Sequence, residues 1–508
     1  MAGGIVAMAL ALASFDPYLF TGGDNAQYYA LTRALATGRG YVDLVTPGTP
    51  PYTQYPPGYP ALLVPFYILF DGSYVALKLV SMLAAAALLW AAYLVARRDP
   101  AVPGWVAAAT VWMVGLYEPF QLYAHRVLSD MPFVALAVLA LAVLQRAAGE
   151  ERGDRLDRDW LIGCALALAA FYVRTAAVAL LAAIVAWALL RRRWRRAALA
   201  AGMFIAFSLP WFLWGRLAGA GGSAGGVYIQ KLVASSPLQS GPRRGRLGHL
   251  LNRLHDTGVE YGTFQLPHLF WPTDPAPDII RVVGCAVGVG LLALGAWRLL
   301  RSRRPAPWDI YVAASLGLLV FWPWIGDRYF LALAPFLWIM MLTGLDALSR
   351  RLTGRGTIAV GATAALAAAL LAAGSVKAVR QWDSTGAWMR GDEFAGYTPF
   401  WADYFRAARW IGGNVPADAV ILARKPTLAW YWSGRPAVSL PRAGNPDRAW
   451  QRIRGNGVTH ILLEPWTERY LRDVLHPRAM YLSVVHETPR REVVVLEVSP
   501  ASDATPPQ

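Results

Sequence analysis

Long apolar runs separated by short arginine-rich tracts constrain this chain more than any other feature. Of its 508 residues, 56% are hydrophobic and 22 are Trp. Many of the uncharged runs approach the ~20 residues that an α-helix needs to cross a bilayer. A soluble protein of this length does not carry so many such runs. The sequence therefore predicts a polytopic α-helical membrane protein.

The basic tracts predict how the spans are oriented. Eleven spans with the N-terminus inside place five arginine tracts on the cytoplasmic side, as the positive-inside rule requires. These tracts fall at 97–98, 152–158, 191–196, 298–304 and 350–355. The net charge of +16 is thus explained by topology. No zinc-finger or recognition-helix pattern accompanies it, which argues against nucleic-acid binding.

The eleven spans are assigned from apolar length. The first lies within residues 1–20, where Ala11-Leu12-Ala13 resembles a signal-peptidase site but no basic segment precedes it, so an uncleaved span is favoured. The others are expected near 74–96, 101–117, 131–147, 160–172, 175–190, 197–215, 279–299, 308–325, 329–347 and 356–376.

The run Trp160–Leu190 is too long for one ordinary span and carries a single charge, Arg174. If it crossed once, the arginine tract at 191–196 would lie outside. We therefore predict a hairpin of two short helices, one ending near Tyr172 and one beginning at Thr175. Arg174 then lies at the external end.

The predicted topology divides the chain at about residue 380. Residues 1–380 form the transmembrane domain, with external loops at about 21–73 and 216–278; within the first, residues 46–70 are read as a proline-rich loop on the membrane. Residues 381–508 alternate helical and strand patterns: helices at 400–412 and 446–457, strands at 418–424 and 458–464, and a final strand pair. They predict a small extracytoplasmic α/β domain with a frayed tail.

The stretch Gly22–Gly40 follows the first span and holds Asp24 at its start. Glycines break the preceding apolar run, and Asn25 to Thr37 reads as one helix closed by Gly38, which places Asp24 as its N-cap. A carboxylate at the membrane surface is a functional candidate. N-capping alone is the alternative interpretation.

Charged residues from five segments are predicted to meet on the external face. Each has a mundane alternative: His125 and Arg126 as interfacial anchors, Asp130 as a helix cap, and Asp327 paired with Arg328. Jointly they suit a reaction in which a carboxylate takes a proton from a hydroxyl while arginines hold a leaving phosphate. The set comprises Asp24, Glu118, His125, Arg126, Asp130, Arg174, Asp327 and Arg328.

Five ordered pieces resemble the GT-C class of membrane glycosyltransferases, in particular bacterial relatives of protein O-mannosyltransferases and aminoarabinose (ArnT-like) transferases. The pieces are GGDNAQYYALTRALATGRGY, YPPGYPALLVPF, HRVLSDMPFVALAVLAL, FYVRTAAVALLAAI and DRYFLALAPFLWIMM. The resemblance covers most of residues 1–350. It implies an inverting transfer from a polyprenyl-phosphate sugar to an acceptor hydroxyl, in a glycan, lipid or protein, at the outer face of the cytoplasmic membrane.

The resemblance also implies roles for residues. Asp24 matches the catalytic base and Asp130 the second external carboxylate, which would orient the acceptor or hold a metal. Arg174 and Arg328 match phosphate-binding arginines, and we place Arg126 with them. Substrate-binding candidates are His125, Tyr28, Tyr55 and Glu118. Many relatives carry a second acid where this chain has Asn25, so a metal role of the opening loop stays open. No cofactor is predicted with it, and a divalent metal stays an open alternative.

Two other classes fit parts of the sequence. A secondary transporter or lipid flippase would also be polytopic, but such proteins show inverted repeats and broken helices near the midplane, and only one split segment is found here. A non-catalytic receptor acting through the C-terminal region would tolerate replacement of Asp24. The sequence decides neither the sugar nor the acceptor.

Overall fold

The computed structural model describes residues 2–147, 154, 156–218, 246–271, 277–322, 325–441 and 445–499. Two compact units emerge. We call residues 1–15, 53–59 and 78–382 the helical unit, and residues 16–52, 60–77 and 383–508 the α/β unit. The sequence analysis draws one boundary near residue 380. The structure instead groups most of the first external loop with the C-terminal region.

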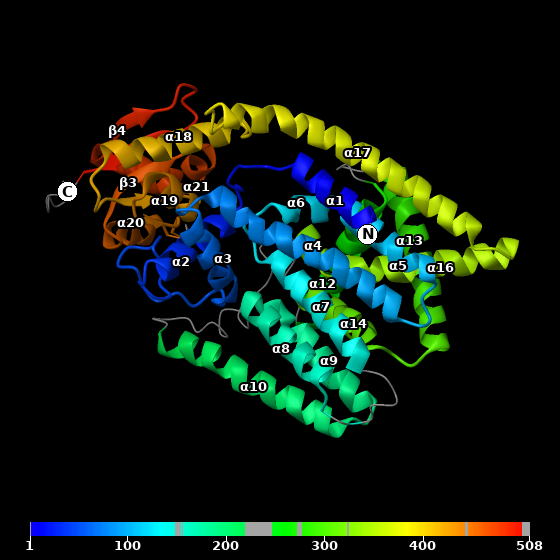
Figure 1. The fold of residues 1–508 in the computed structure, drawn as a ribbon. Helices are drawn as coiled ribbons and strands as arrows, with labels where there is room; N and C mark the ends of the chain where they lie inside the picture. The colour runs from blue at the N-terminus through cyan, green and yellow to red at the C-terminus, as the bar shows by residue number, and fades with distance from the viewer. Residues whose placement is uncertain are drawn as a thin grey trace. The chain divides into compact units, whose positions relative to one another are not determined.

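Helices cover each of the eleven segments expected to span the membrane (Figure 1). Within the described ranges, five of them are long and apolar enough to cross a bilayer: α4, α7, α10, α13 and α17. The helices are α1 (Ala2–Ala13), α4 (Tyr74–Arg98), α5 (Gly104–Leu116), α7 (Asp130–Ala147), α8 (Arg158–Val173), α9 (Val178–Leu190), α10 (Trp194–Leu217), α13 (Asp278–Ser302), α14 (Pro307–Phe321), α16 (Ala334–Thr353) and α17 (Thr357–Met389). The number of spans stays a prediction.

The predicted break at Arg174 is present. Helix α8 ends at Val173, Arg174 has an extended backbone (φ −155°, ψ 124°), and the 3₁₀ turn η2 (Thr175–Ala177) leads into α9. Helix α8 packs against α7, whereas α9 packs against α10 and α14; Figure 1 shows α8 and α9 beside α10. Because each half has its own neighbours, the chain can turn at Arg174 without losing helix packing.

Two predicted loops contain helices. The segment 46–70 includes α3 (Gly58–Leu69), and the segment 216–278 includes α12 (Arg246–Val259), the π-helix η3 (Glu260–Gln265) and the 3₁₀ turn η4 (Pro267–Leu269). The prediction that 46–70 is a loop throughout was wrong. Pro60 falls in the first turn of α3, where the backbone N–H that proline lacks would have no hydrogen-bond partner within the helix. Residues 219–245 of the second predicted loop lie outside the described ranges.

Helices α13 and α16 approach so closely that their backbones nearly touch. A Cβ atom added at Gly344 would lie 2.3 Å from the carbonyl oxygen of Leu291, and one added at Gly295 would lie 1.9 Å from that of Met340. Real Cβ atoms do not come that close, so glycine is required at both positions. The contact is of the small-residue type that lets membrane helices pack.

Replacing Gly344 by Ala should therefore separate α13 from α16. We expect a loss of about 1–3 kcal/mol of stability, the usual range for forcing extra atoms into a packed interior. The midpoint of thermal unfolding in detergent measures it. Gly290→Ala is the matched control, since nothing lies within 4 Å of its added Cβ and Ala is the better helix former. Equal midpoints for both variants would contradict the close approach.

The α/β unit holds a five-stranded sheet in the order β2-β1-β3-β5-β4. Strand β1 pairs in parallel with β2 and β3, and β5 pairs antiparallel with β3 and β4. The expected strands and helices at these places are present, together with four elements that the sequence did not predict: β2, α19, α21 and the 3₁₀ turn η5. The elements are α18 (Pro399–Asn414), β1 (Val420–Leu422), α19 (Pro426–Ser433), β2 (Ala437–Val438), α20 (Pro446–Gly455), β3 (Val458–Leu463), α21 (Pro465–Leu475), η5 (His476–Tyr481), β4 (Leu482–Glu487) and β5 (Val494–Val498).

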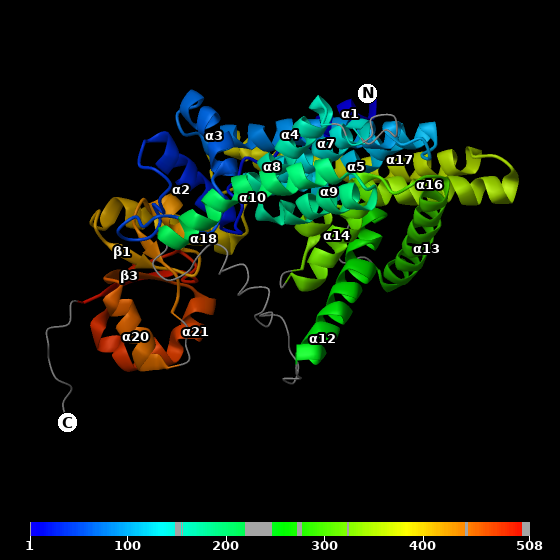
Figure 2. The ribbon, with the colours of Figure 1, turned by 90° about the horizontal axis from the view of Figure 1, so that it is seen from below.

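Helices cover both faces of the parallel strands, so β1 is buried along its whole length. On one face, Val420, Leu422 and Ile461 join a core with Ile453 of α20 and Leu471 of α21. Figure 2 shows α20 and α21 together on that side of the sheet. Helix α19 contacts β1 and β2 and packs against α18.

The chain after the first helix belongs to the same unit. Helix α2 (Asp24–Ala36) packs against α19. The backbone N–H of Ala437 donates to Val45 O at 2.8 Å, and Tyr397 Oη donates to Leu19 O at 2.9 Å. The opening loop is thus held by the C-terminal region through backbone groups as well as side chains.

Candidate active site

A buried carboxylate forms the centre of the site in the helical unit. Asp130 is 1% exposed, and Arg174 Nη1 lies 2.7 Å from its Oδ1. Arg328 approaches the other side, with Nη2 3.0 Å from Oδ2 and Nε 3.2 Å from Oδ1. Three of the predicted site residues, from three distant segments, therefore meet at one carboxyl group.

Local sequence places each of these side chains. Asp130 is the first residue of α7, and Pro132 fits the first turn of that helix. Arg174 occupies the break between α8 and η2. Arg328 lies in the short helix α15 (Asp327–Phe330), which follows Gly326. Gly326 has φ 152°, a conformation that favours glycine and turns the chain sharply before the arginine.

A second carboxylate extends the cluster. Asp327 Oδ1 accepts a hydrogen bond from Tyr123 Oη at 3.1 Å and from the backbone N–H of Arg328 at 2.7 Å. The guanidinium of Arg328 pairs with Asp130, and its backbone N–H is the group that bonds Asp327. Burial raises the pKa of Tyr123, and the charges of Asp327 and Asp130 add to it, so this phenol stays a donor.

Aromatic rings support the cations. Arg126 lies with its guanidinium carbon 5.3 Å from the centre of the Tyr123 ring. Arg174 and Arg328 lie 5.5 Å and 5.8 Å from the same ring, that of Tyr329. Contacts of this kind stabilise a cation that has lost part of its hydration. Three arginines are thus held close to two aspartates.

Lys78 is a buried cation that the sequence analysis missed. It lies in α4 and is 1% exposed, with Nζ 5.6 Å from the centre of the Phe15 ring. The ring of His125, which is also buried, lies 6.0 Å from Phe15. A buried lysine is rare. The signal was available, because Lys78 is the only charge between Tyr74 and Tyr93.

Two other predicted site residues also belong to the helical unit. Glu118, at the start of α6 (Glu118–Ala124), forms an ion pair with Lys377 of α17. Tyr55 is half-buried in the segment before α3 and belongs to the helical unit. Their role in substrate binding stays a prediction.

Asp24 and Tyr28 belong to the α/β unit. The N-cap of α2 is Gly23 (φ 99°), and Asp24 is the first residue inside the helix, so the prediction that Asp24 is the N-cap was wrong. Only glycine takes such a φ without strain, which explains why Gly23 precedes the helix. Asp24 is half-buried, whereas Tyr28 is buried.

Asn25 occupies the position at which many members of the class that this sequence resembles carry a second acid. Its side chain is completely buried and its Nδ2 donates to Tyr74 Oη at 3.0 Å. Its Oδ1 has no hydrogen-bond partner among the residues that the structure describes. A buried amide oxygen without a partner costs folding free energy.

Two side chains of the C-terminal region hold the backbone in front of Asp24. Lys425 Nζ donates to Gly22 O at 3.1 Å, and Thr427 Oγ1 donates to Gly23 O at 3.0 Å. Burial lowers the pKa of Lys425, the charge of Arg424 lowers it further, and the carboxylate of Asp24 acts in the opposite direction. Asp24 is therefore placed by its own glycines and by the residues that follow β1.

Thr427→Val should loosen this placement. The isosteric change removes the hydroxyl that bonds Gly23 O, at a cost of about 1 kcal/mol. We expect faster amide hydrogen exchange at residues 22–27, measured by mass spectrometry of the whole protein. Thr427→Ser keeps the hydroxyl and should exchange like the parent. Unchanged exchange in the valine variant would show that the bond does not restrain the loop.

Within the described ranges, no group of three or more His, Cys, Asp or Glu side chains lies close enough to hold a metal ion.

Comparisons with known proteins identify the family. The model of Glycosyltransferase family 87 matches residues 52–323, just over half of the chain. The chain belongs to glycosyltransferase family 87. No curated protein matches the sequence.

Solved structures show the fold of this family 87 member. ArnT from Cupriavidus metallidurans in the apo state has a TM-score of 0.60 at 17% identity, and its complex with undecaprenyl phosphate has 0.60 at 16%; each match covers 97% of both chains. The oligosaccharyltransferase of Archaeoglobus fulgidus, in complex with Zn and sulfate, has 0.58 at 13%, covering 97% of this chain and 73% of that one. The predicted resemblance to GT-C glycosyltransferases is confirmed, and the chain is an integral membrane protein of that fold.

Within this glycosyltransferase, the family match includes Tyr55, Glu118, His125, Arg126, Asp130 and Arg174 but stops before Asp327 and Arg328. Asp24 also lies outside it. The clustered carboxylate and arginines therefore combine residues inside and outside the matched segment.

Proposed function

We propose that this family 87 glycosyltransferase moves a sugar from a polyprenyl-phosphate-linked donor to an acceptor hydroxyl at the outer face of the cytoplasmic membrane. The observation that carries the proposal is the buried Asp130 held between Arg174 and Arg328. Three arginines and two aspartates give the cluster one excess positive charge, and guanidinium groups bind phosphate oxygens in a fixed geometry. The likeness to ArnT, which has been seen with undecaprenyl phosphate, supports a lipid-linked donor.

In this proposal, the arginines act on the leaving group. The bond between the anomeric carbon and the phosphate oxygen breaks, and charge accumulates on the lipid phosphate. Arg174 and Arg328 stabilise that charge, while Asp130 fixes where they point. Groups held in place before the reaction stabilise charge more effectively than mobile ones. A phosphate leaving group needs no proton from a general acid.

Asp24 is proposed as the general base. Its carboxylate takes the proton of the acceptor hydroxyl as that oxygen attacks the anomeric carbon from the side opposite the phosphate, which inverts the configuration. The half-buried position of Asp24 at the start of α2 keeps the carboxylate accessible to a substrate. Buried Lys78 supplies a further cation for the donor phosphate.

The proposed topology follows from the arginine tracts. The N-terminus lies inside, and Arg174, Asp130 and the α/β unit lie outside. Five basic tracts agree with this parity, which would place the reaction at the outer surface, where polyprenyl-linked donors present their sugars.

Sugar transfer in membrane vesicles tests the proposal. Vesicles containing the parent protein are supplied with a panel of radiolabelled polyprenyl-phosphate sugars, and label entering endogenous acceptors is counted after extraction of the lipids. We expect transfer from one donor and none from the corresponding nucleotide sugar. Movement of labelled donor across the membrane without any transfer would overturn the proposal in favour of a flippase.

A further inference from the structure

The edge of the α/β sheet where the parallel strands end carries an exposed aromatic surface. The chain runs from β1 to β2 on one side and then crosses to β3 on the other, so the strand order reverses between β1 and β3. In sheets of this kind, ligands bind outside the carboxyl ends of the strands at that point. The residues at this edge are Arg424, directly beyond β1, and Glu464 to Trp466, directly beyond β3.

Two stacked rings at this edge form an aromatic platform, and Trp466 is its exposed member. Trp466 and Tyr470, one turn apart on α21, stack with ring centres 5.2 Å apart and an angle of 8°. Trp466 is 51% exposed, which is unusual for the largest apolar side chain in a folded domain. An exposed aromatic face flanked by polar groups is the arrangement that binds the apolar face of a sugar ring.

Arg424 provides directed hydrogen-bond donors beside the platform. Its guanidinium lies between two rings, 5.6 Å from the centre of Trp401 and 5.7 Å from that of Trp466. Nε pairs with Glu464 Oε1 at 2.7 Å, and Glu464 is in turn fixed by the backbone N–H groups of Trp466 and Thr467. Among the described residues, Nη1 and Nη2 of Arg424 donate no hydrogen bond. Four N–H groups are thus held rigidly and left for a ligand.

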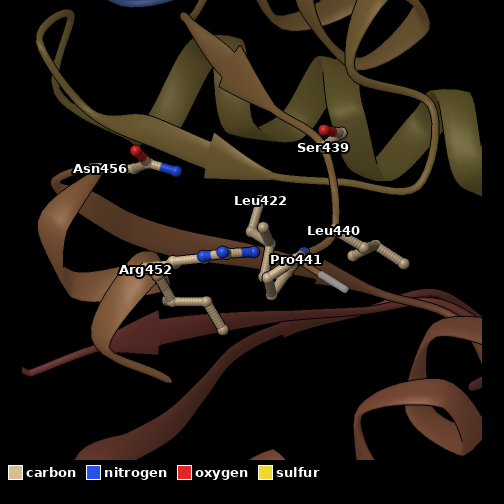
Figure 3. Close-up of a pocket in the computed structure, with 7 residues that line it drawn as sticks. Leu422, Ser439, Leu440, Pro441, Arg452 and Asn456 are labelled. Atoms are coloured by element: carbon tan, nitrogen blue, oxygen red, sulfur yellow. The ribbon is translucent and has the colours of Figure 1, made fainter. Parts of the chain in front are cut away.

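A cavity continues from the platform. Tyr470 Oη donates to Pro441 O at 3.1 Å, and Pro441 lines a cavity of about 390 Å³ on the same side of the sheet. Leu422 and Leu440 contribute apolar surface to it, and Ser439, Arg452 and Asn456 contribute polar groups. In Figure 3, Arg452 extends toward Pro441 and Leu422. This volume is within the range of about 300–1,000 Å³ typical of small-ligand sites.

The platform is linked directly to Asp24. The four residues from Arg424 to Thr427 run from the platform to the opening loop, where Lys425 and Thr427 bond Gly22 O and Gly23 O. All these residues belong to the α/β unit. A saccharide bound at the platform would therefore lie in the unit that carries the proposed base.

We infer that the carboxyl edge of the parallel strands is a saccharide-binding site that holds the acceptor, so that the acceptor of this transferase is a glycan. Trp466, backed by Tyr470, stacks against one sugar ring, Arg424 donates to its hydroxyls, and the cavity beside Pro441 takes an adjoining unit. Calling the bound saccharide the acceptor rests on the proposed function; the binding itself does not.

Binding of neutral oligosaccharides to the full chain in lipid nanodiscs tests the site. The probes are mannotetraose, maltotetraose and N-acetylchitotetraose, detected by saturation-transfer difference NMR and titrated by calorimetry. We expect at least one probe to bind, and Trp466→Ala to raise its Kd about tenfold or more because the stacking surface is lost. Trp410→Ala is the matched control: Trp410 stacks on His486 with ring centres 4.5 Å apart, away from this edge. Arg424→Lys, which keeps a cation beside Glu464 but loses the planar fork of donors, should weaken binding while its thermal midpoint stays close to that of the control.

Each result is decisive. Failure of all three probes, or equal binding by the parent and Trp466→Ala, would overturn the site. Quenching of Trp466 fluorescence by brominated lipid would show a membrane anchor and also overturn it. Asp24→Asn should bind the probe as the parent does. If probe binding depends on Trp466 but no sugar is ever transferred, the site stands and the proposed function fails. If sugar is transferred but probe binding does not depend on Trp466, the proposed function stands and the site fails.

Discussion

Replacement of Asp24 by Asn is expected to lower the rate of sugar transfer by about two to four orders of magnitude, the usual contribution of a general base. The amide has nearly the shape of the carboxylate but cannot take a proton from the acceptor hydroxyl. Gly23, and not Asp24, is the N-cap of α2, so the change leaves the N-cap residue itself intact. Donor binding should be unaffected, so the loss should appear in kcat.

The measurement is a single-turnover assay of radiolabelled donor in purified protein. Asp43→Asn is the matched control, because Asp43 lies in the same loop and accepts hydrogen bonds from Gln27 Nε2 at 3.1 Å and from Thr46 Oγ1 at 2.8 Å. Its replacement should lower stability but spare kcat. Full activity in Asp24→Asn would move the search for the base to Asp130.

Much of the helical unit could be predicted because short, continuous stretches of the sequence specify its helices. Arginine tracts and apolar length locate the spans, and one charge in an overlong run locates the break at Arg174. The meeting of Arg174 and Arg328 at Asp130 followed from topology, since all three were expected on one face. The precise partners did not follow: whether Arg328 pairs with Asp327 or Asp130 depends on backbone turns such as that at Gly326.

The grouping of the opening loop with the C-terminal region could not be predicted. It depends on pairings between segments nearly 400 residues apart, such as Thr427 with Gly23, and no pattern in one sequence records such pairs. The platform at Trp466 was missed for the same reason: α21 was not expected, and the alignment of Trp466 with Tyr470 requires a helix there. Lys78 was overlooked although its isolation in an apolar run was visible.

The second large effect is expected for Asp130→Asn, which should remove both stability and transfer. The carboxylate is buried and engages two arginines, with contacts of 2.7 Å and 3.0 Å. Removing one member of a buried ion pair typically costs about 3–5 kcal/mol, because the remaining charge is left uncompensated. Here Arg174 and Arg328 would repel each other and turn away from the positions that bind the donor phosphate.

Asp99→Asn separates stability from chemistry. Asp99 is buried, like Asp130, and pairs with Arg303 at 2.7 Å. It lies in the loop after α4, directly after the arginine tract at 97–98 that is predicted to be cytoplasmic. Arg303 also pairs with Asp309, so the loss of stability should be smaller. Thermal unfolding and transfer per folded molecule are measured together. We expect Asp99→Asn to lose stability alone, and Asp130→Asn to lose both.

The double variant Asp130→Asn/Arg174→Gln provides the sharper test. It removes one of the two arginines that would repel each other, so part of the lost stability should return. Transfer should not return, because a phosphate-binding arginine is now missing as well, and the KM for the lipid donor should rise further. If transfer recovered along with stability, Asp130 and Arg174 would be a structural ion pair, and the donor phosphate would have to be bound by other cations, Lys78 and Arg126 first among them.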